Sequence, residues 1–568
     1  MPSNIYTGIE EAYKERTDLL IVALTGRTGS GCTTTADILS KPFADISITP
    51  DDFPAPEERK LVIANRYCAK QWEPFRSISV STVILSFLLE EENAEIAKFF
   101  ADQKLVVTKQ FLEALDTLRS ETNYPEFRDC IVNGVRASGA NAWLFYNESL
   151  KARAIETKKI LAEQYTPVFQ TLGNNIRFSG SALSKEINPA ELFSLIRRVK
   201  RLAKAAFIHA QETGTKSTRI VIDAVRNPLE LVYLRDQFAA FYAIAITCDD
   251  DDRIARLEEI GLSKKDIKAI DEKEYSERKH LDSYNDFVSQ NIQDCIQKSD
   301  IFFANSGSPS AMTQNRRTLN AQIVRYVALM LRPGLVTPTR DERCMQLAFV
   351  AKANSGCISR QVGAAVADEN HSIKAVGWND VPKGQVPCLL RDVDELLTGG
   401  DKNAFSDFEK KDQKFLTQVK QTFANRAQLK DGGLPCPYCF KREYNKSRKT
   451  DNQVHTRSLH AEENAFLQLA KHGNSGIDHG FLYTTASPCE LCSKKAFQLG
   501  IKEIVYVDPY PGISSSHILS SGEERARPIL RLFGGAIGHA YHRLYDSILP
   551  VKDEYLARLA DDPQRSLL

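Results

Sequence analysis

The stretches LHAEENAF at residues 459–466 and SPCELC at residues 487–492 carry the most specific chemistry of this 568-residue chain. They place one histidine, His460, and two cysteines, Cys489 and Cys492, in a pattern that suits a metal ion. Two cysteines at positions i and i+3 of a first helical turn point the same way, and the positive end of the helix favours their thiolates. With one imidazole they supply three ligands of a tetrahedral Zn²⁺ and leave the fourth position open.

Glu462, two residues after the histidine, indicates a catalytic site. A structural zinc site has four protein ligands, whereas this pattern offers three ligands and a carboxylate. A bound zinc ion lowers the pKa of a coordinated water to about 7, and a neighbouring carboxylate can accept the proton of that water and pass it on. We therefore expect Zn²⁺ at His460, Cys489 and Cys492, with Glu462 as the catalytic acid and base. A structural zinc knuckle, or a set of buried thiols, is the alternative.

The segment RQVGAAVADENHSIKAVGWND at residues 360–380 predicts a β-hairpin with DENH at its turn. Together with HAEENA and SPCELC, it resembles the cytidine and deoxycytidylate deaminase superfamily, which carries HxE followed by PCxxC. The resemblance implies a cytidine deaminase-like α/β/α sandwich with a five-stranded sheet, and hydrolytic attack on C4 of a cytosine ring. It also implies that Asn379 binds the sugar hydroxyl of the substrate, although an asparagine after a strand is more often a turn former.

A second metal site is predicted in the long segment between Asn379 and His460. Cys436 and Cys439 form another CxxC pair, and Cys388 and His455 lie in the same segment. Four such ligands would close a structural zinc site. The alternative is a pair of thiols in a loop.

The first half of the chain contains a different motif, a glycine-rich loop after an apolar strand. The apolar run LLIVALT at residues 19–25 is followed by GRTGSGCTTT at 26–35, which matches the phosphate-binding pattern GxxxxGK[ST] except that a cysteine replaces the lysine. Backbone N–H groups of such a loop and the positive end of the following helix attract phosphate. The candidate nucleotide-binding residues are Gly26, Gly29, Gly31, Cys32 and Thr33, of which Thr33 suits Mg²⁺. Because the lysine stabilises charge during phosphoryl transfer, its loss should impair transfer more than binding.

The runs RIVIDAV, YAIAITC and IFFANS predict further strands of a parallel sheet, with a mostly helical insertion at about residues 55–210. We interpret the insertion as a lid or subdomain. The segment RPGLVTP at 332–338 suits a domain boundary. The predicted division is therefore an α/β P-loop kinase-like domain at residues 1–334 and a deaminase-like domain at 335–568.

The segment IVIDAVRNPLELVYLR at 220–235 resembles the IDGIRNP segment of the deoxynucleoside monophosphate kinase and dephospho-coenzyme A kinase group. DDDRIARL at 250–257 resembles the lid of that group, which implies phosphate contacts for Arg253 and Arg256. A regulatory nucleotide-binding domain, a structural relic and a residual kinase all remain open for this half.

The order of the two halves, and DPYPGISSSHIL at 508–519, resemble the bacterial anti-phage dCTP deaminase family. The resemblance implies conversion of dCTP, and of dCMP, to deoxyuridine nucleotides, which depletes the precursors of phage DNA. It further implies control through the first domain, restraint by a small RNA in some members, and a homo-oligomer.

The 74 basic and 73 acidic side chains give no global field that would favour nucleic acid or a membrane. The N-terminal segment has no leader pattern, and no run is long and apolar enough to span a bilayer, so we expect a cytoplasmic protein without membrane contact. Three other functions remain: an editor of single-stranded nucleic acid using the basic stretch at 438–449, a metabolic dCMP deaminase, and an inactive binding module. Arg360 and Lys383, which flank the hairpin, are candidates for contacts with substrate phosphate.

Overall fold

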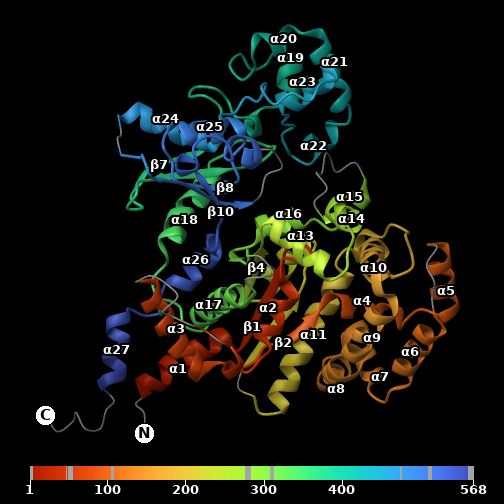
Figure 1. Ribbon diagram of the computed structural model, residues 1–568. Helices are drawn as coiled ribbons and strands as arrows, with labels where there is room; N and C mark the ends of the chain where they lie inside the picture. The colour runs from red at the N-terminus through yellow and green to blue at the C-terminus, as the bar shows by residue number, and fades with distance from the viewer. Residues whose placement is uncertain are drawn as a thin grey trace. The chain divides into compact units, whose positions relative to one another are not determined.

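The chain folds into two compact units in the computed structural model (Figure 1). The first contains Met1–Thr337 and His539–Leu568, and the second contains Pro338–Gly538. The structure describes residues 4–46, 48, 56–103, 108–215, 217–274, 283–307, 312–473, 476–508 and 514–560. Within these residues, no helix is both long and apolar enough to cross a membrane.

The C-terminal residues return to the first unit, which differs from the predicted division at 334/335. Helix α27 (Val551–Ala560) brings Glu554 to the hydroxyl of Tyr13, which donates to the Glu554 carboxylate at 2.9 Å. Arg543 in α26 (Gly538–Tyr545) donates to the carbonyl oxygen of Phe241 at 3.3 Å. These polar contacts to the first unit, which local sequence patterns do not reveal, place the last two helices there.

The first unit contains a parallel sheet in the order β5-β4-β1-β3-β2. The strands are β1 (Leu19–Thr25), β2 (Arg76–Ser79), β3 (Thr218–Asp223), β4 (Phe241–Thr247) and β5 (Ile301–Ala304). Strand β1 lies at the centre and is almost continuously buried, as expected for a strand covered on both faces. The four predicted strands are confirmed, and β2 is an addition from within the insertion.

Helices connect these strands. They are α1 (Asn4–Thr17), α2 (Cys32–Leu39), α3 (Glu57–Gln71), α12 (Pro228–Gln237), α13 (Asp250–Glu259), α14 (Lys264–Glu274), α15 (Tyr284–Val288), α16 (Ile292–Lys298) and α17 (Met312–Leu331). Helix α2 begins directly after the glycine-rich loop, and α13 and α14 follow β4. The loop is therefore set between the central strand and the start of α2.

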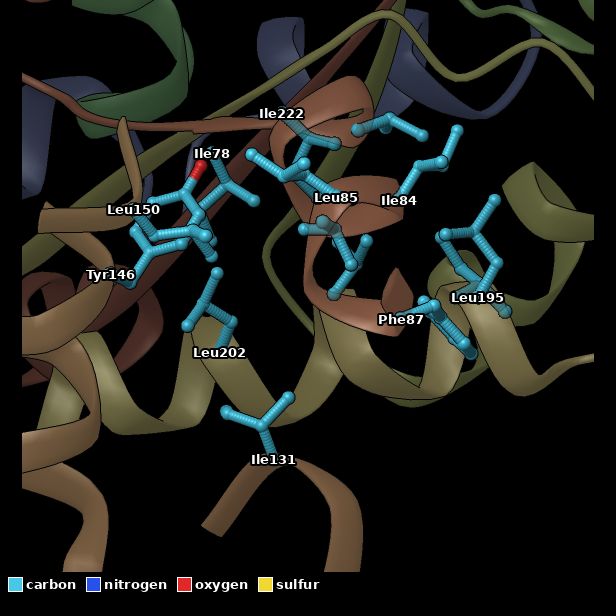
Figure 2. Close-up of a cluster of buried hydrophobic side chains, with 14 of the residues drawn as sticks. Ile78, Ile84, Leu85, Phe87, Ile131, Tyr146, Leu150, Leu195, Leu202 and Ile222 are labelled. Carbon is cyan, nitrogen blue, oxygen red and sulfur yellow. The ribbon is translucent and has the colours of Figure 1, made fainter. Parts of the chain in front are cut away.

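The insertion is mostly helical, as predicted. It contains α4 (Val80–Leu88), α5 (Asn93–Asp102), α6 (Lys109–Ser120), α7 (Tyr124–Arg128), α8 (Gly139–Leu144), α9 (Lys151–Leu161), α10 (Tyr165–Ser179) and α11 (Ser194–Glu212). Figure 2 shows Leu85 of α4 and Leu202 of α11 in one apolar cluster with Ile78 of β2 and Ile222 of β3. Burial of each such side chain contributes about 1.5–3 kcal/mol. The insertion is thus a subdomain whose core is continuous with one face of the sheet.

The second unit contains a five-stranded sheet in the order β10-β9-β8-β6-β7. Its strands are β6 (Gly363–Ala367), β7 (Ile373–Trp378), β8 (Phe481–Ala486), β9 (Glu503–Asp508) and β10 (Ile529–Leu532), followed by the short β11 (Gly535–Ala536). Strands β6 and β7 form the predicted antiparallel hairpin, whereas β8, β9 and β10 run parallel to one another.

Helices cover both faces of this sheet (Figure 1). Side chains that alternate along the strands, such as Val366 and Leu482, pack with residues of α24 (Ala461–His472) and α25 (Glu490–Gln498). The opposite face meets α18 (Arg340–Lys352), where Tyr483 donates to Asp341 at 2.8 Å. Because successive side chains of a strand point to opposite faces, helices pack on both sides of the sheet, which gives the expected α/β/α arrangement.

The segment between β7 and α24 has a small core of its own. Its helices are α19 (Val393–Thr398), α20 (Asp407–Lys411), α21 (Gln413–Thr422), α22 (Ala427–Asp431) and α23 (Phe440–Arg448). Phe415, Val419 and Tyr438 are buried together there. Arg391 lies within this core, pairs with Glu409 and stacks over the ring of Tyr438 at 4.6 Å.

Candidate metal centre and glycine-rich loop

Two helix starts bring the predicted metal ligands together. His460 is the residue that caps α24, and Cys489 caps α25, with Cys492 one turn further. The two Sγ atoms lie 3.3 Å and 3.5 Å from Nδ1 of His460, Cys489 being the nearer. Gly377 of β7 lets α24 approach closely, because a Cβ atom there would lie 2.3 Å from the carbonyl oxygen of Ala461. The close helix approach fixes the first turn of α24, which carries the ligand and the catalytic carboxylate.

Glu462 lies in that first turn and is 4% exposed. The hydroxyl of Thr484, on β8, is 3.3 Å from its Oε1 atom and 2.8 Å from the carbonyl oxygen of Ala486. Burial raises the pKa of Glu462 above its ordinary value. A carboxyl group in this environment exchanges a proton more readily near neutral pH than an exposed one does.

The surroundings shift the pKa values of the two cysteines in opposite directions. A hydrogen bond from the Cys492 thiol, together with one from His460, lowers the pKa of Cys489 to about 4. The same contact with Cys489, together with burial, raises the pKa of Cys492. The hydrogen bond to Cys489 also raises the pKa of His460. The lowered pKa of Cys489 favours its thiolate, which is the form of cysteine that binds a metal cation.

These three residues fit a zinc ion. Their ligand atoms lie within 4.8 Å of one another, and among the described residues no other group of three or more histidine, cysteine, aspartate or glutamate side chains does so. One imidazole and two thiolates are a donor set typical of zinc sites with an open fourth position. The structure thus assembles the predicted ligands His460, Cys489 and Cys492 beside Glu462.

The residues predicted to hold a second zinc ion do not form a compact group of this kind. Cys436 is 4% exposed and packs in the core of the β7–α24 segment, where its backbone N–H donates to Asp392 at 2.9 Å. The ring of His455 lies against that of Tyr444, with centroids 4.3 Å apart. The ligand atoms of Cys388, Cys436, Cys439 and His455 do not all lie within 4.8 Å of one another in the described structure, and a zinc ion held by these residues stays a prediction.

Asn379 lies at the end of β7 and bridges two backbone groups. Its Oδ1 accepts from the N–H of Val362 at 2.7 Å, and its Nδ2 donates to the carbonyl oxygen of Arg360 at 2.7 Å. The amide therefore shapes the turn that leads into β6. Arg360 pairs with the buried Asp508 at the end of β9, and Lys383 is exposed.

The glycine-rich loop of the first unit has the expected backbone form. Gly26, Gly29 and Gly31 have φ of 158°, 89° and 112°, values that side chains disfavour. A Cβ atom at Gly31 would lie 2.4 Å from Nδ2 of Asn305, which donates to the carbonyl oxygen of Ser30 at 2.7 Å. Asn305, the residue that follows β5, thus holds the loop.

Cys32 is buried at the start of α2, and burial raises its pKa to about 12. It therefore brings no charge to the position of the missing lysine. Thr33 donates to Asp223 at 3.0 Å. Of the two predicted phosphate ligands, Arg256 donates to the carbonyl oxygens of Asn305 and Gly307. Arg253 is 1% exposed and, like Arg256, has protein partners.

The comparisons with known proteins fall on the second unit. Residues 338–508 match the family model described as the cytidine and deoxycytidylate deaminase zinc-binding region. This part of the chain is deoxycytidylate deaminase-like. The matched range contains all three ligands and Glu462, and the zinc-binding character of the family supports Zn²⁺ as the metal.

Among curated proteins, the chain is similar to the deoxycytidylate deaminase of Schizosaccharomyces pombe, with 29% identity over 184 residues. That match covers 32% of this chain and 41% of the relative. It is also similar to the deoxycytidylate deaminase of Enterobacteria phage T4, with 27% identity over 29% of this chain and 76% of the relative. The chain thus spans less than half of the first relative's length.

Among solved structures, the dCMP deaminase of cyanophage S-TIM5 in complex with dCMP and dUMP is 25% identical over 35% of this chain and 99% of that one, with a TM-score of 0.21. Its apo form is 23% identical over 35% of this chain and 100% of that one, with a TM-score of 0.20.

Sequence patterns did not identify Thr484, Asp508 or Glu274 as residues of either site. For Thr484 a signal exists, because alternation along β8 places it on the same face as Leu482, toward α24. Glu274 has no such signal, since its contact with the glycine-rich loop joins residues 246 positions apart.

Proposed function

We propose that the second unit catalyses the hydrolytic, zinc-dependent deamination of deoxycytidine nucleotides, dCTP and dCMP, to deoxyuridine nucleotides. The observation that carries the proposal is the buried carboxylate of Glu462 beside the cluster of His460, Cys489 and Cys492. A structural metal site has no use for a buried carboxylate that does not ligate the metal. The similarity to deoxycytidylate deaminases supports a cytosine nucleotide as the substrate.

The reaction replaces the amino group on C4 of cytosine by an oxygen atom and releases ammonia. When bound, zinc would supply Lewis-acid activation of water at neutral pH. Glu462 accepts one proton from the attacking water and delivers it to N3 of the ring, and it then carries the second proton, from the hydroxyl now on C4, to the departing amine. The hydrogen bond from Thr484 orients the carboxyl group during these transfers. Burial of Glu462 keeps bulk water from competing for its protons.

The turn around Asn379 supports a site for the sugar. Its amide retains one donor and one acceptor lone pair after bonding Arg360 and Val362, which suits the 3′-hydroxyl of a deoxyribose. Arg360 is the nearby cation that we assign to substrate phosphate; in the described structure it pairs with Asp508.

The wider role that we propose is depletion of deoxycytidine nucleotides as a defence against phage, with a nucleotide bound to the first unit as the control. The family resemblance of the two halves supports this role, as do the left-handed glycines of the loop at residues 26–33. A homo-oligomer and restraint by a small RNA belong to the same proposal. A domain that senses nucleotides without turnover suits an activity that is toxic when uncontrolled.

An editor of single-stranded nucleic acid receives less support. Such enzymes stack bases on exposed aromatic rings. Tyr444, one of the aromatic residues of the basic stretch, packs against Phe408 and Phe440, with ring centroids 5.7 Å away in both cases. Arg448 pairs with Asp412 at 2.6 Å. These side chains of the stretch therefore stabilise the local core and do not form a groove for nucleic acid.

The test incubates zinc-loaded full-length protein with dCTP, dCMP, CTP and a cytosine-bearing single-stranded oligonucleotide, and separates the products by chromatography. Glu462→Gln should reduce turnover by a factor of about 10² or more, whereas its neighbour variant Glu463→Gln should retain activity. Glu463 is the matched control because it is the next residue of α24 and its carboxylate pairs with Lys495 of α25. Uracil formed only in the oligonucleotide would replace the proposal by an editor.

A further inference from the structure

The glycine-rich loop of the first unit already holds an anion. The backbone N–H of Thr28 donates to Oε2 of Glu274 at 2.9 Å, and its hydroxyl donates to Oε1 of the same carboxylate. Arg226 pairs with this carboxylate and also donates to the Thr28 hydroxyl at 3.3 Å. The Glu274 side chain is 0% exposed. The carboxylate thus receives a backbone N–H, a hydroxyl and a guanidinium, the groups that a phosphate accepts from in such loops.

Other cations beside the loop are neutralised in the same way. Arg27 pairs with Asp271 at 3.0 Å and also with Asp250. Arg253 pairs with Asp271 at 2.8 Å and donates to the carbonyl oxygen of Thr28 at 3.2 Å. All three acidic partners, Asp250, Asp271 and Glu274, come from α13 and α14. These helices therefore supply the negative charge that the loop and its arginines attract.

The charge of Glu274 is balanced by groups outside its own helix. These are the N–H and hydroxyl of Thr28, from the glycine-rich loop, and the guanidinium of Arg226. A competing anion that offers more charge to the same donors would displace it at moderate cost.

We propose that the loop at residues 26–33 is a polyphosphate site that Glu274 fills in the ligand-free protein, and that a nucleoside triphosphate binds by displacing Glu274 from Thr28 and Arg226. The inference rests on the proposed binding of a nucleotide to the first unit, and it names the residues that control it. Since Cys32 carries no charge, Arg226 provides the cation that the lysine of the loop pattern would otherwise supply. Glu274 therefore sets the concentration at which the first unit responds.

The test measures binding of inorganic tripolyphosphate to the full-length, zinc-loaded protein by titration calorimetry. Glu274→Gln removes the competing charge and should tighten binding by about tenfold or more, because a larger fraction of the protein has an accessible loop. Glu272→Gln is the matched control: Glu272 is exposed on the same helix and lies 3.9 Å from Lys268. It should bind as the wild type does. Adding Arg226→Gln to Glu274→Gln should abolish the gain.

Equal affinities of Glu274→Gln and wild type would overturn the displacement mechanism while leaving nucleotide binding intact. Absence of binding in both proteins at millimolar tripolyphosphate would defeat nucleotide binding by the first unit as well. Neither result bears on Glu462, since deamination by the second unit is measured separately. If Glu274→Gln does not fold, Glu274→Asp decides the question, because its shorter side chain withdraws the carboxylate from the Thr28 N–H and should also tighten binding.

Discussion

The Oε1 atom of Glu462 lies 3.3 Å from the hydroxyl of Thr484, a contact between the first turn of α24 and strand β8. Both side chains are buried, and Thr484 is 0% exposed. The hydroxyl also lies 2.8 Å from the carbonyl oxygen of Ala486, so that its one proton is shared between these two acceptors and its position is fixed. A rigid strand thus positions the carboxyl group that we assign to proton transfer.

Thr484→Val should lower kcat by about tenfold with little change in KM, because one hydrogen bond that orients Glu462 is lost while the sugar and phosphate contacts remain. Thr484→Ser keeps the hydroxyl and should restore most of the rate. Steady-state kinetics on dCMP, with zinc content measured by atomic absorption, checks both variants. Equal kcat values for the valine variant and the wild type would show that Glu462 needs no support from β8.

Zinc analysis should find one metal ion per chain, because the described residues contain one group of suitable ligands. Cys489→Ser with Cys492→Ser should abolish both the bound zinc and the activity. Dialysis against a strong chelator should abolish activity, and added Zn²⁺ should restore it. Two zinc ions per chain in the wild type would instead support the second zinc site predicted around Cys436 and Cys439.

Gly31→Ala should destabilise the first unit by about 1–3 kcal/mol, because the residue has φ of 112° and a Cβ atom would lie 2.4 Å from Asn305. Gly214→Ala separates the two causes, since Gly214 has φ of 75° but nothing within 4 Å of its Cβ position. Thermal unfolding of the three proteins gives the comparison. If Gly31→Ala lowers the unfolding temperature no more than Gly214→Ala does, the packing of Asn305 against the loop is not tight.

The sequence predicted the metal cluster well because its geometry is local. His460 and Glu462 occupy one helix start, and Cys489 and Cys492 occupy another, so spacing alone determines which way the side chains point. Four strands of the first sheet and the β6–β7 hairpin of the second were predicted for a similar reason, since apolar runs and alternation reflect burial directly.

Contacts over long sequence separations were not predictable in this way. Glu274 meets Thr28 across 246 residues, and Glu554 meets Tyr13 across 541. Both are carboxylates on helices that look like solvated surface by composition. The four residues of the predicted second zinc site lie in a segment with no period that orients side chains, so spacing alone does not show whether they converge, and that site stays a prediction.

The buried pair of Arg391 and Glu409 gives the β7–α24 segment a predictable acid sensitivity. Their side chains are 0% and 1% exposed. Burial raises the pKa of Glu409, but the charge of Arg391 and hydrogen bonds from Ser406 and Tyr438 outweigh it, so that the pKa falls below its ordinary value of 4.5. Because the folded pKa is the lower one, the ionised carboxylate stabilises the fold above about pH 4.5, and this stability is lost as the pH falls through the folded value.

Glu409→Gln should therefore lower the stability of the second unit by about 3–5 kcal/mol at pH 7, since Arg391 is left buried without a counter-charge. The difference from the wild type should shrink at an acidic pH below the folded pKa of Glu409, where the wild-type carboxylate also becomes protonated. Thermal unfolding at both pH values, followed by tyrosine fluorescence, measures this. Asp407→Asn is the control on the same helix, because its pairing with Lys411 is exposed and its loss should leave the unfolding temperature unchanged. A pH-independent difference between Glu409→Gln and the wild type would mean that packing around Tyr438, and not the charge pair, holds this segment.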